Sequence, residues 1–278
     1  MKSLFDKVSA ATSKTTTKMY STSFSLGIYC LNKKLHRAIY NIYGFVRFAD
    51  EIVDSFHDYD KKTLFDEFKL ETAKAIERKI SLNPILNSFQ EVVHQYNIEQ
   101  DLIDCFLKSM EMDLSQTMHN ETSYNEYILG SAEVVGLMCL RVFTNGNEQH
   151  YQTLKPSAMK LGAAFQKVNF LRDLNDDYNY LGRIYFPSVD MKSLSENDKR
   201  QIELEIQQDF NDALIGIKQL PATSKYGVYV AYVYYLSLLK KIKATPTSQI
   251  MLQRIRVPNY EKISLLFSSY LKLTLNLV

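Results

Sequence analysis

The sequence is poor in the residues that mark several common kinds of protein. Its 278 residues include only three cysteines, Cys30, Cys105 and Cys139, and no two of them have C-x-x-C spacing. An odd number of unclustered thiols argues against a disulfide framework and is typical of a reducing cytoplasm. The nine glycines form neither a Walker loop nor a dinucleotide fingerprint, so the usual nucleotide-binding motifs are absent from the sequence.

Neither sign of charge dominates the chain. Thirty-three Lys and Arg against 31 Asp and Glu leave a formal net charge of +2, and no basic block carries interleaved aromatics. Nucleic acid is therefore not an expected partner. Lys240, Lys241 and Lys243 form the densest basic cluster near an apolar run. Such a cluster usually solvates a helix end, and contact with a membrane surface is the alternative.

Long apolar runs are also missing. The longest, residues 226–239, has fourteen residues, whereas a membrane-spanning helix needs about 20. Lys2, Asp6 and Lys7 interrupt the N-terminal stretch, so it lacks the apolar segment of a signal peptide. We expect a cytoplasmic protein, soluble or in peripheral contact with the inner membrane.

What is present is helical periodicity. Apolar residues recur at three- and four-residue spacing along nearly the whole chain, and no linker or fixed-period repeat interrupts it. We therefore expect an all-α protein with a single domain spanning residues 1–278. Ser123 and Ser195, each with an acidic residue three positions later, mark helix starts. The predicted helices, with bounds good to about three residues, are 3–18, 33–56, 60–79, 84–97, 99–118, 123–143, 149–178, 195–219, 222–243, 247–256 and 260–276.

A first polar stripe lies on the predicted helix 33–56. Asp50 and Asp54 are four residues apart and so share one face, one turn above the other. Arg47 and Tyr43 continue the same stripe. The flanking positions are apolar, which indicates a helix buried around a polar line.

The predicted helix 149–178 repeats the pattern. Gln166, Asn169, Asp173 and Asp177 follow at spacings of three, four and four, inside an otherwise apolar helix. One such pair of carboxylates alone is best interpreted as a solvated helix face. Two aligned stripes inside apolar helices favour a shared inward-facing site.

Inward-facing pairs of carboxylates require a cation. Two carboxylates about 6 Å apart repel by roughly 3 kcal/mol at an effective dielectric of about 20, against a few tenths of a kcal/mol on a solvated helix. The oxygen ligands of Asp and Asn suit Mg²⁺, which is normally shared with substrate phosphates. The two stripes therefore predict a magnesium site.

Five strings follow one another along nearly the whole chain: S-T-S-F at 21–24, D-E-I-V-D at 50–54, M-E-M-D-L at 110–114, the stretch 166–177, and G-R-I-Y-F-P at 182–187. In this order they resemble the motifs of the squalene/phytoene synthase family. Glu51 stands in the first aspartate motif where Asp is commoner, and Ser109 replaces a glycine that phytoene synthases have before M-x-M-D-L.

The resemblance implies an isoprenoid synthase fold, a helical bundle around a central cavity. It implies catalytic roles for Asp50, Asp54, Asp173 and Asp177, which with Asn169 would hold two to three Mg²⁺ ions and a diphosphate, with Mn²⁺ as a substitute. For Arg254 and Lys262 a solvated helix end is the alternative role. The residues that the resemblance assigns to substrate binding are Tyr20, Ser21, Thr22, Ser23, Tyr43, Arg47, Gln166, Arg172, Tyr235, Arg254 and Lys262.

The resemblance also implies an activity: condensation of two geranylgeranyl diphosphates through prephytoene diphosphate to phytoene, in carotenoid biosynthesis, without NADPH. The implied partners are polyprenyl diphosphates, a membrane that takes up the product, and carotenoid-pathway enzymes. A squalene or dehydrosqualene synthase acting on farnesyl diphosphate is the alternative within the family. A non-catalytic assembly factor or lipid carrier is the alternative outside it, and would be expected to lose carboxylates from one stripe.

One position departs from the family pattern. Where the family has A-G-x-V-G, residues 132–136 read A-E-V-V-G, so Glu133 replaces the first glycine and Gly136 is kept. Glu133 either points away from the site or takes part in it. We favour the first interpretation.

Overall fold

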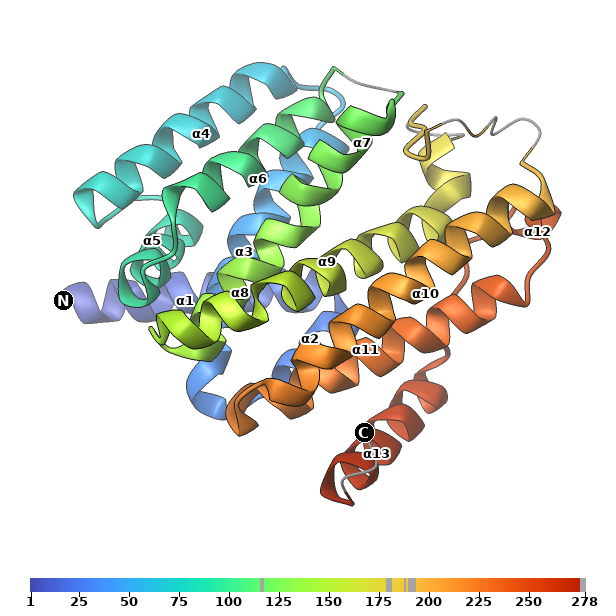
Figure 1. Ribbon diagram of the computed structural model, residues 1–278. Helices are drawn as coiled ribbons and strands as arrows, with labels where there is room; N and C mark the ends of the chain where they lie inside the picture. Colours follow the sequence, from blue (N-terminus) through green and yellow to red (C-terminus); the bar gives the residue numbers. More distant parts are fainter. Residues whose placement is uncertain (116–117, 179–181, 188, 190–193, 276–278) are drawn as a thin grey trace.

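The computed structural model describes the chain except residues 116–117, 179–181, 188, 190–193 and 276–278, together with the side chains of Thr22 and Ser23. The described chain is almost entirely helical (Figure 1), and its pairing of β type is one bridge between Met118 and Ile184. The helices are α1 (Lys2–Tyr20), α2 (Thr22–Tyr29), α3 (Lys33–Ser55), α4 (Lys61–Arg78), α5 (Pro84–Tyr96), α6 (Gln100–Met112), α7 (Glu121–Ile128), the π-helical turn η1 (Leu129–Glu133), α8 (Val134–Thr144), α9 (Glu148–Asp176), α10 (Glu196–Gln219), α11 (Ala222–Lys243), α12 (Thr247–Ile250) and α13 (Asn259–Thr274).

The all-α prediction is confirmed, but the structure differs from the predicted bounds at three places. α2 was not predicted, because its Ser- and Thr-rich start resembles a loop; here the Ser21 hydroxyl caps it by accepting from the Phe24 amide at 3.2 Å. α6 ends at Met112 rather than near 118, and the Asp113 carbonyl just beyond its end accepts a bond from Arg183 at 3.1 Å. α12 ends at Ile250 after a single turn, whereas the sequence pattern predicted a helix over 247–256.

Helix starts follow the side chains that cap them. Ser195 caps α10 in a reciprocal box with Asp198, as predicted. The start predicted at Ser123 is wrong: Asn120 is the cap, and the Ser123 hydroxyl accepts a bond from the Asn120 backbone N–H. The same capping box is present, but it begins three residues earlier than the sequence pattern suggested.

Two apolar cores divide the bundle between them. One gathers residues of α3, α5 and α6, with Phe45 and Phe89 stacked 3.9 Å apart, and the other gathers residues of α9, α10 and α11 around Phe170 and Phe210. Residues of both cores line one large cavity. The cores therefore hold the two predicted stripes on helices that flank a common space.

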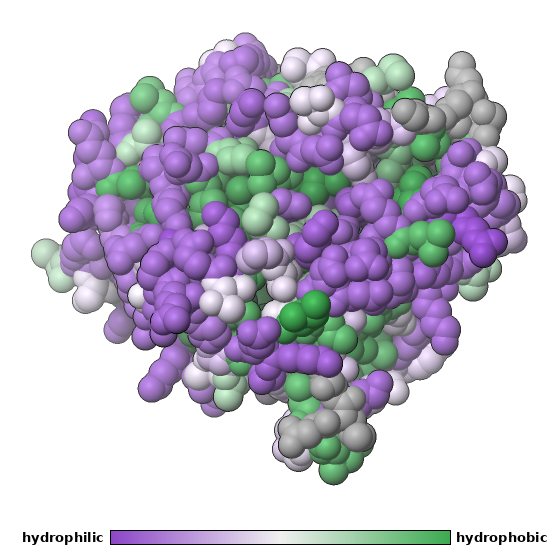
Figure 2. Space-filling view, viewed as in Figure 1, coloured by the Kyte–Doolittle hydropathy of each residue, from purple (hydrophilic) through white to green (hydrophobic). Residues whose placement is uncertain are grey.

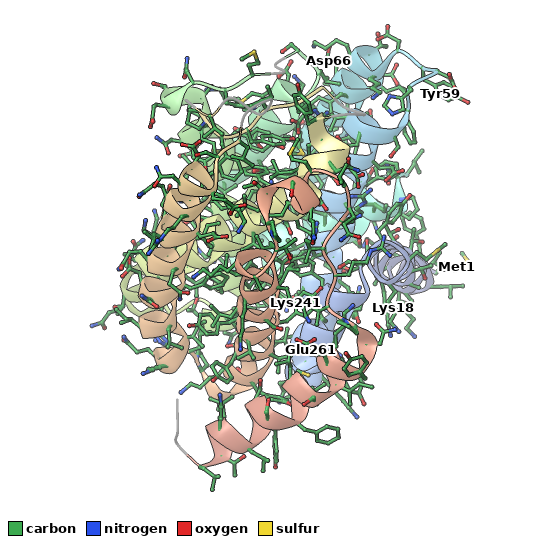
Figure 3. The ribbon with its side chains drawn as sticks, turned by 90° about the vertical axis from the view of Figure 1, so that its right-hand side faces the viewer. Met1, Lys18, Tyr59, Asp66, Lys241 and Glu261 are labelled. Atoms are coloured by element: carbon green, nitrogen blue, oxygen red, sulfur yellow. The ribbon has the colours of Figure 1, made fainter. Side chains whose placement is uncertain are left out.

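Polar residues cover most of the face shown in Figure 2, and apolar surface appears at its lower end. α4 and α13 lie at opposite ends of the molecule in Figure 1, and Figure 3 shows Asp66 of α4 at the top with Glu261 of α13 in the lower half. α13 extends beyond the rest of the bundle. The helical stretch Glu121–Thr144 is long and apolar enough to cross a membrane, yet 67% of its most apolar window is buried inside the protein. It is a core helix of the bundle.

α1 crosses α3 at close range because α3 has a glycine at the crossing. A Cβ added at Gly44 would lie 2.6 Å from the Ser13 Cβ and 2.9 Å from the Ser13 Cα, closer than real contacts allow. The Ser13 hydroxyl in turn bonds the Ser88 hydroxyl at 2.7 Å. This crossing brings Tyr20, at the end of α1, over the guanidinium of Arg47.

We expect Gly44→Ala to lower the free energy of unfolding by about 1–3 kcal/mol, because the added methyl forces α1 and α3 apart. Gly27→Ala is the matched control: its Cβ would meet the Ala231 Cβ at an ordinary 3.6 Å, and alanine favours a helix. Urea titration followed by circular dichroism measures both. A Gly44→Ala protein as stable as the wild type would show that the two helices are not in close contact.

Candidate active site

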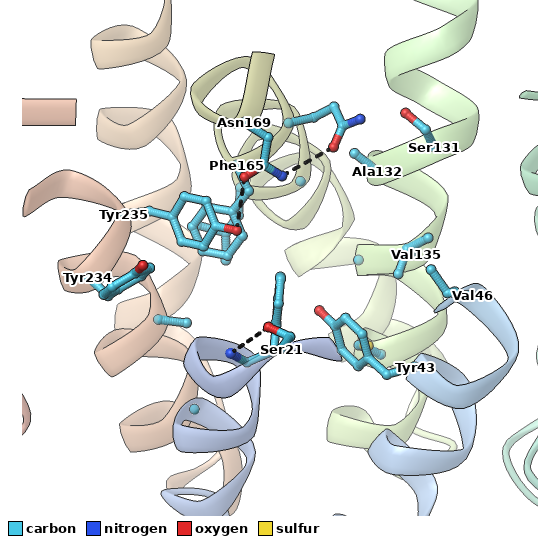
Figure 4. A pocket seen from close by; sticks show the side chains of 18 of the residues that line it. Ser21, Tyr43, Val46, Ser131, Ala132, Val135, Phe165, Asn169, Tyr234 and Tyr235 are labelled. Carbon is cyan, nitrogen blue, oxygen red and sulfur yellow. Dashed lines mark hydrogen bonds between the residues drawn. The ribbon is translucent and has the colours of Figure 1, made fainter. Parts of the chain in front are cut away.

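The cavity between the two cores has a volume of about 1130 Å³. Residues from α1, α2, α3, α8, α9, α10, α11 and the segment 254–259 line it. Figure 4 shows how Ser21, Tyr43, Asn169 and Tyr235 lie around one open space. Helices remote in the sequence thus meet at a single site.

The stripe of α3 reaches the cavity. Asp50, Asp54, Arg47 and Tyr43 all line it. Arg47 donates hydrogen bonds to both Asp50 and Glu51, and its guanidinium stacks over the Tyr20 ring, 4.4 Å from the ring centre. Arg47 is therefore held by three side chains on its own side of the cavity.

The stripe of α9 lines the same cavity. The Tyr235 hydroxyl donates to the Asn169 side-chain oxygen at 3.2 Å, and the Asn169 amide donates to Gln166 at 3.5 Å (Figure 4). Arg172 donates to Asp173 through its Nε at 2.9 Å, and Arg254 contacts the same carboxylate oxygen at 2.8 Å. Asp173 is thus flanked by two guanidinium groups.

Arg183 joins the two stripes. Its guanidinium bonds Asp54 of α3 at 2.7 Å, and its backbone N–H donates to the Asp177 carbonyl at the end of α9 at 2.9 Å. The same guanidinium reaches the Asp113 carbonyl, and the Arg183 side chain is only 8% exposed. This residue was not among the predicted site residues. The only signal for it in the sequence was its place in the G-R-I-Y-F-P string.

The carboxylates of this region repel one another. Burial, together with Asp54, raises the pKa of Asp50 to about 7, although Arg47 opposes the shift. Burial and the Asp173 carboxylate raise the pKa of Asp177 to about 8. Burial also raises the pKa of Asp113 to about 7, against the opposing charge of Arg183. The five carboxyl groups Asp50, Asp54, Asp113, Asp173 and Asp177 also outnumber the four nearby arginines, so in their ionised form the site carries an excess of negative charge.

This excess of negative charge fits the predicted magnesium site. The donors are carboxylate and amide oxygens, which Mg²⁺ prefers, and a divalent cation would stabilise the ionised form of Asp50 and Asp177. Among the described residues no three acidic, His or Cys side chains converge tightly enough to form a metal site. Asp50, Asp54 and Asp173 each also bond an arginine, and a carboxylate has lone pairs enough to bond an arginine and a cation together.

The predicted site residues come together, as far as the structure describes them. Thr22 and Ser23 lie outside the described side chains. The cavity also has polar lining residues that were not predicted, among them Asp176, Tyr234 and Asn259. The predicted residues that line the cavity are Tyr20, Ser21, Tyr43, Arg47, Asp50, Asp54, Gln166, Asn169, Arg172, Asp173, Asp177, Tyr235, Arg254 and Lys262.

Glu133 is not a lining residue of this cavity, whereas its neighbours Ala132 and Val135 are. Burial raises the pKa of Glu133, and the nearby Lys160 and Lys167 oppose the shift. It ends the π-helical turn Leu129–Glu133, where one extra residue per turn rotates the positions that follow. Glu133 thus faces the lysines of α9 rather than the cavity.

Away from the carboxylates the cavity becomes apolar and aromatic. Phe165 stacks on Tyr235 at 3.9 Å, and Phe24 lies 4.7 Å from Tyr43. Burial raises the pKa of Tyr43 well above its usual value and that of Tyr235 to about 12, so both phenols stay protonated. The far wall is apolar, with Leu154, Ile217, Leu220, Leu140 and Phe143.

Comparison with known proteins agrees with this geometry. A sequence model of the family described as squalene/phytoene synthase matches residues 17–261. The chain is 27% identical over 251 residues to phytoene synthase 1, chloroplastic, of Zea mays, a match covering 81% of this chain and 59% of the maize protein. It is 26% identical over 216 residues to the 4,4'-diapophytoene synthase of Staphylococcus haemolyticus, covering 74% of this chain and 70% of that protein.

The same comparison extends to solved structures. A dehydrosqualene synthase that is 20% identical superimposes with a TM-score of 0.81, covering 97% of this chain and 98% of that one. This likeness confirms the predicted isoprenoid synthase fold. The chain spans 59% of the length of its maize relative, so the likeness in sequence concerns only part of that protein.

The raised pKa values predict how stability responds to pH and Mg²⁺. A carboxyl whose pKa is raised by folding stabilises the protein below its unfolded pKa, and that stabilisation is lost as pH rises through the folded pKa. Without metal we expect the Tm to fall between about pH 6 and about pH 8.5, by at least about 3 °C, since 1 kcal/mol corresponds to about 2–4 °C in a domain of this size. Mg²⁺ should raise the Tm more at the higher pH.

Thermal scans in EDTA and in MgCl₂ measure this difference. Asp177→Asn should reduce both the pH dependence and the effect of Mg²⁺, whereas Asp58→Asn, at an exposed position beyond the end of α3, should change neither. A Mg²⁺ effect of equal size at both pH values would contradict the link between metal binding and these carboxylates.

Proposed function

Because the chain belongs to the squalene/phytoene synthase family, we propose that it joins two polyprenyl diphosphates head to head and releases an apolar hydrocarbon. The observation that carries the proposal is the pair of carboxylate stripes on α3 and α9, which line a single cavity that is apolar away from them. A charged end and an apolar interior match an amphiphilic substrate with a diphosphate head and a prenyl tail.

The arginines around the carboxylates are suited to the diphosphates. Arg47, Arg172 and Arg183 are fixed by carboxylates at the cavity wall, and Arg254 is within reach of Asp173. A guanidinium binds phosphate oxygens in a bidentate manner and stays charged, so it stabilises the negative charge that develops on the leaving group. When bound by Asp50, Asp54, Asn169, Asp173 and Asp177, Mg²⁺ would add charge neutralisation of the same diphosphate.

The chemistry proceeds in two ionisations. In the first, the C–O bond of one substrate breaks, diphosphate leaves with the electron pair, and the double bond of the second substrate attacks the allylic cation. Loss of a proton then closes a cyclopropane that still carries one diphosphate. In the second, this diphosphate leaves, the cation rearranges, and a further proton is lost to give the hydrocarbon. Released diphosphate accepts the protons, since the phenols of Tyr43 and Tyr235 are neutral.

The apolar wall protects the cations. Water would convert them into alcohols, and the far wall of the cavity is formed by aliphatic and aromatic side chains. Phe165, Tyr235 and Phe24 present rings to the cavity, and an aromatic face stabilises a cation by about 0.5–2 kcal/mol.

The proposed substrate is geranylgeranyl diphosphate and the product phytoene, formed without NADPH in carotenoid biosynthesis. A cavity of 1130 Å³ exceeds the usual range of about 300–1,000 Å³ for small-molecule pockets, as two long prenyl chains require. Farnesyl diphosphate is the alternative, because one relative is named 4,4'-diapophytoene synthase. The proposed location is the cytoplasm, with reversible membrane contact to release the product beside other carotenoid-pathway enzymes.

We expect Asp50→Asn and Asp173→Asn each to lower kcat at least about a hundredfold, equivalent to about 2.7 kcal/mol, because each removes a negative charge from one stripe. Release of diphosphate from a prenyl diphosphate, with and without Mg²⁺, measures the loss. Asp58→Asn is the control and should retain wild-type turnover. Full activity of both stripe variants, or of the wild type in EDTA, would contradict the proposal that these carboxylates bind a metal ion needed for turnover.

We expect the C20 diphosphate to be used with higher kcat/KM than the C15 diphosphate, with a forty-carbon product that is the same with and without NADPH. Separate incubations followed by mass analysis of the hydrocarbon measure both points. The preference should be moderate, because an apolar pocket that holds the longer chain also admits the shorter one. A more efficient thirty-carbon synthesis would assign the C15 substrate, and a more reduced product with NADPH would assign squalene-type chemistry.

A further inference from the structure

α13 is apolar on the side that faces away from the bundle. Its exposed apolar residues recur at three- and four-residue spacing along the whole helix, so they form one continuous stripe. Figure 2 shows apolar surface at the lower end of the molecule, where α13 lies in Figure 1. The stripe, called here the outer face of α13, consists of Tyr260, Ile263, Phe267, Tyr270, Leu271 and Leu275, each 55–76% exposed.

The opposite side of α13 is apolar as well, and it is covered. Leu265 and Leu273 pack against the core around α11, and the Tyr226 hydroxyl of α11 donates to the Leu266 carbonyl at 3.1 Å. A helix that is apolar on both sides is normally buried on both. Single exposed apolar residues are ordinary, but a continuous stripe on an otherwise polar surface indicates a binding partner.

The charge around this helix identifies the kind of partner. Residues 213–278 contain nine Lys and Arg and a single acidic residue, Glu261, a net charge of +8 in a chain whose net charge is +2. Lys241 neutralises Glu261 at 2.8 Å, and the Ser237 hydroxyl donates to it at 2.6 Å (Figure 3). The chain segment that carries the apolar stripe is therefore cationic, with Lys240 and Lys272 exposed on its helices.

The cavity wall leads to this helix. Residues 254–258, which immediately precede α13, line the cavity, and so do Asn259 and Lys262 in its first turn. Lys262 also lies over the Tyr234 ring, 5.5 Å from its centre. The outer face of α13 thus begins where the cavity wall reaches the surface.

We propose that the outer face of α13 docks on an anionic lipid bilayer, with its aromatic and aliphatic side chains in the interfacial layer and the lysines of α11 and α13 on the lipid headgroups. Apolar burial and attraction to anionic lipid together give reversible binding of this kind. A second copy of the chain is a poorer occupant, because two surfaces of like charge would face each other. The docking extends the proposed function by giving the product a route into lipid, but it requires neither substrate nor turnover.

The test measures binding of the full chain, without substrate, to vesicles of phosphatidylcholine with and without phosphatidylglycerol. We expect at least tenfold stronger binding to the anionic vesicles, weakened by added salt. The double variant Phe267→Asp/Leu271→Asp should bind the anionic vesicles at least tenfold more weakly than the wild type. Leu70→Asp is the matched control, because Leu70 is an exposed leucine of α4, a helix at the other end of the molecule from α13 in Figure 1, and is 55% exposed against 58% for Leu271. It should bind like the wild type.

Unchanged circular dichroism and Tm of the variants show that they are folded. Wild-type binding by the double variant, equal loss in Leu70→Asp, or equal binding to neutral and anionic vesicles would each overturn the proposal. So would a wild-type dimer that the double variant converts to a monomer while vesicles bind neither. Turnover in detergent separates this idea from the enzymatic one: a double variant that is active in detergent but does not bind vesicles supports docking, and vesicle binding by an inactive wild type would reject only the proposed function.

Discussion

The structure is organised around carboxylates that repel one another at the edge of a largely apolar cavity. Asp50 and Asp54 on α3 face the same space as Asp173 and Asp177 on α9, and their repulsion has to be offset by positive charge. That charge comes from four arginines that line the same cavity, Arg47, Arg172, Arg183 and Arg254. Because Asp50 and Asp177 are buried and the offset is incomplete, their pKa values stay high, and the site retains an affinity for cations that a fully paired network would lack.

Arg183 makes the two stripes one site. It couples the end of α9 to α3, through Asp177 and Asp54, and its guanidinium also bonds the Asp113 carbonyl just after α6. One residue thus links the ends of three helices at the carboxylates. Tyr127 adds to this cluster by donating to Asp113 at 2.7 Å. A buried network of this kind is costly to assemble, and its position beside the cavity is consistent with a role in holding substrate charge.

The sequence alone was sufficient for the features that depend on local spacing. Helical periodicity predicted nearly all of the long helices, and the four-residue spacing of Asp50 and Asp54 placed both on one face. It was insufficient where contacts between distant segments decide the outcome: α2 depends on a serine cap, and Arg183 is recognisable only once α3 and α9 are known to line the same cavity. The orientation of Glu133 depends on the π-helical turn before it, which has no distinctive spacing of its own.

The net charge differs in sign between the first three quarters of the chain and the last quarter. Residues 1–212 carry a net charge of −6 and contain all of the clustered carboxylates, whereas residues 213–278 carry +8 and end in the apolar helix α13. An anionic bilayer attracts the second part and repels the first, so electrostatics alone would orient the protein before any apolar contact forms. The segment 254–259 lines the cavity and leads directly into α13. In that orientation the proposed product would leave the cavity close to the lipid, at the segment whose Arg254 contacts Asp173.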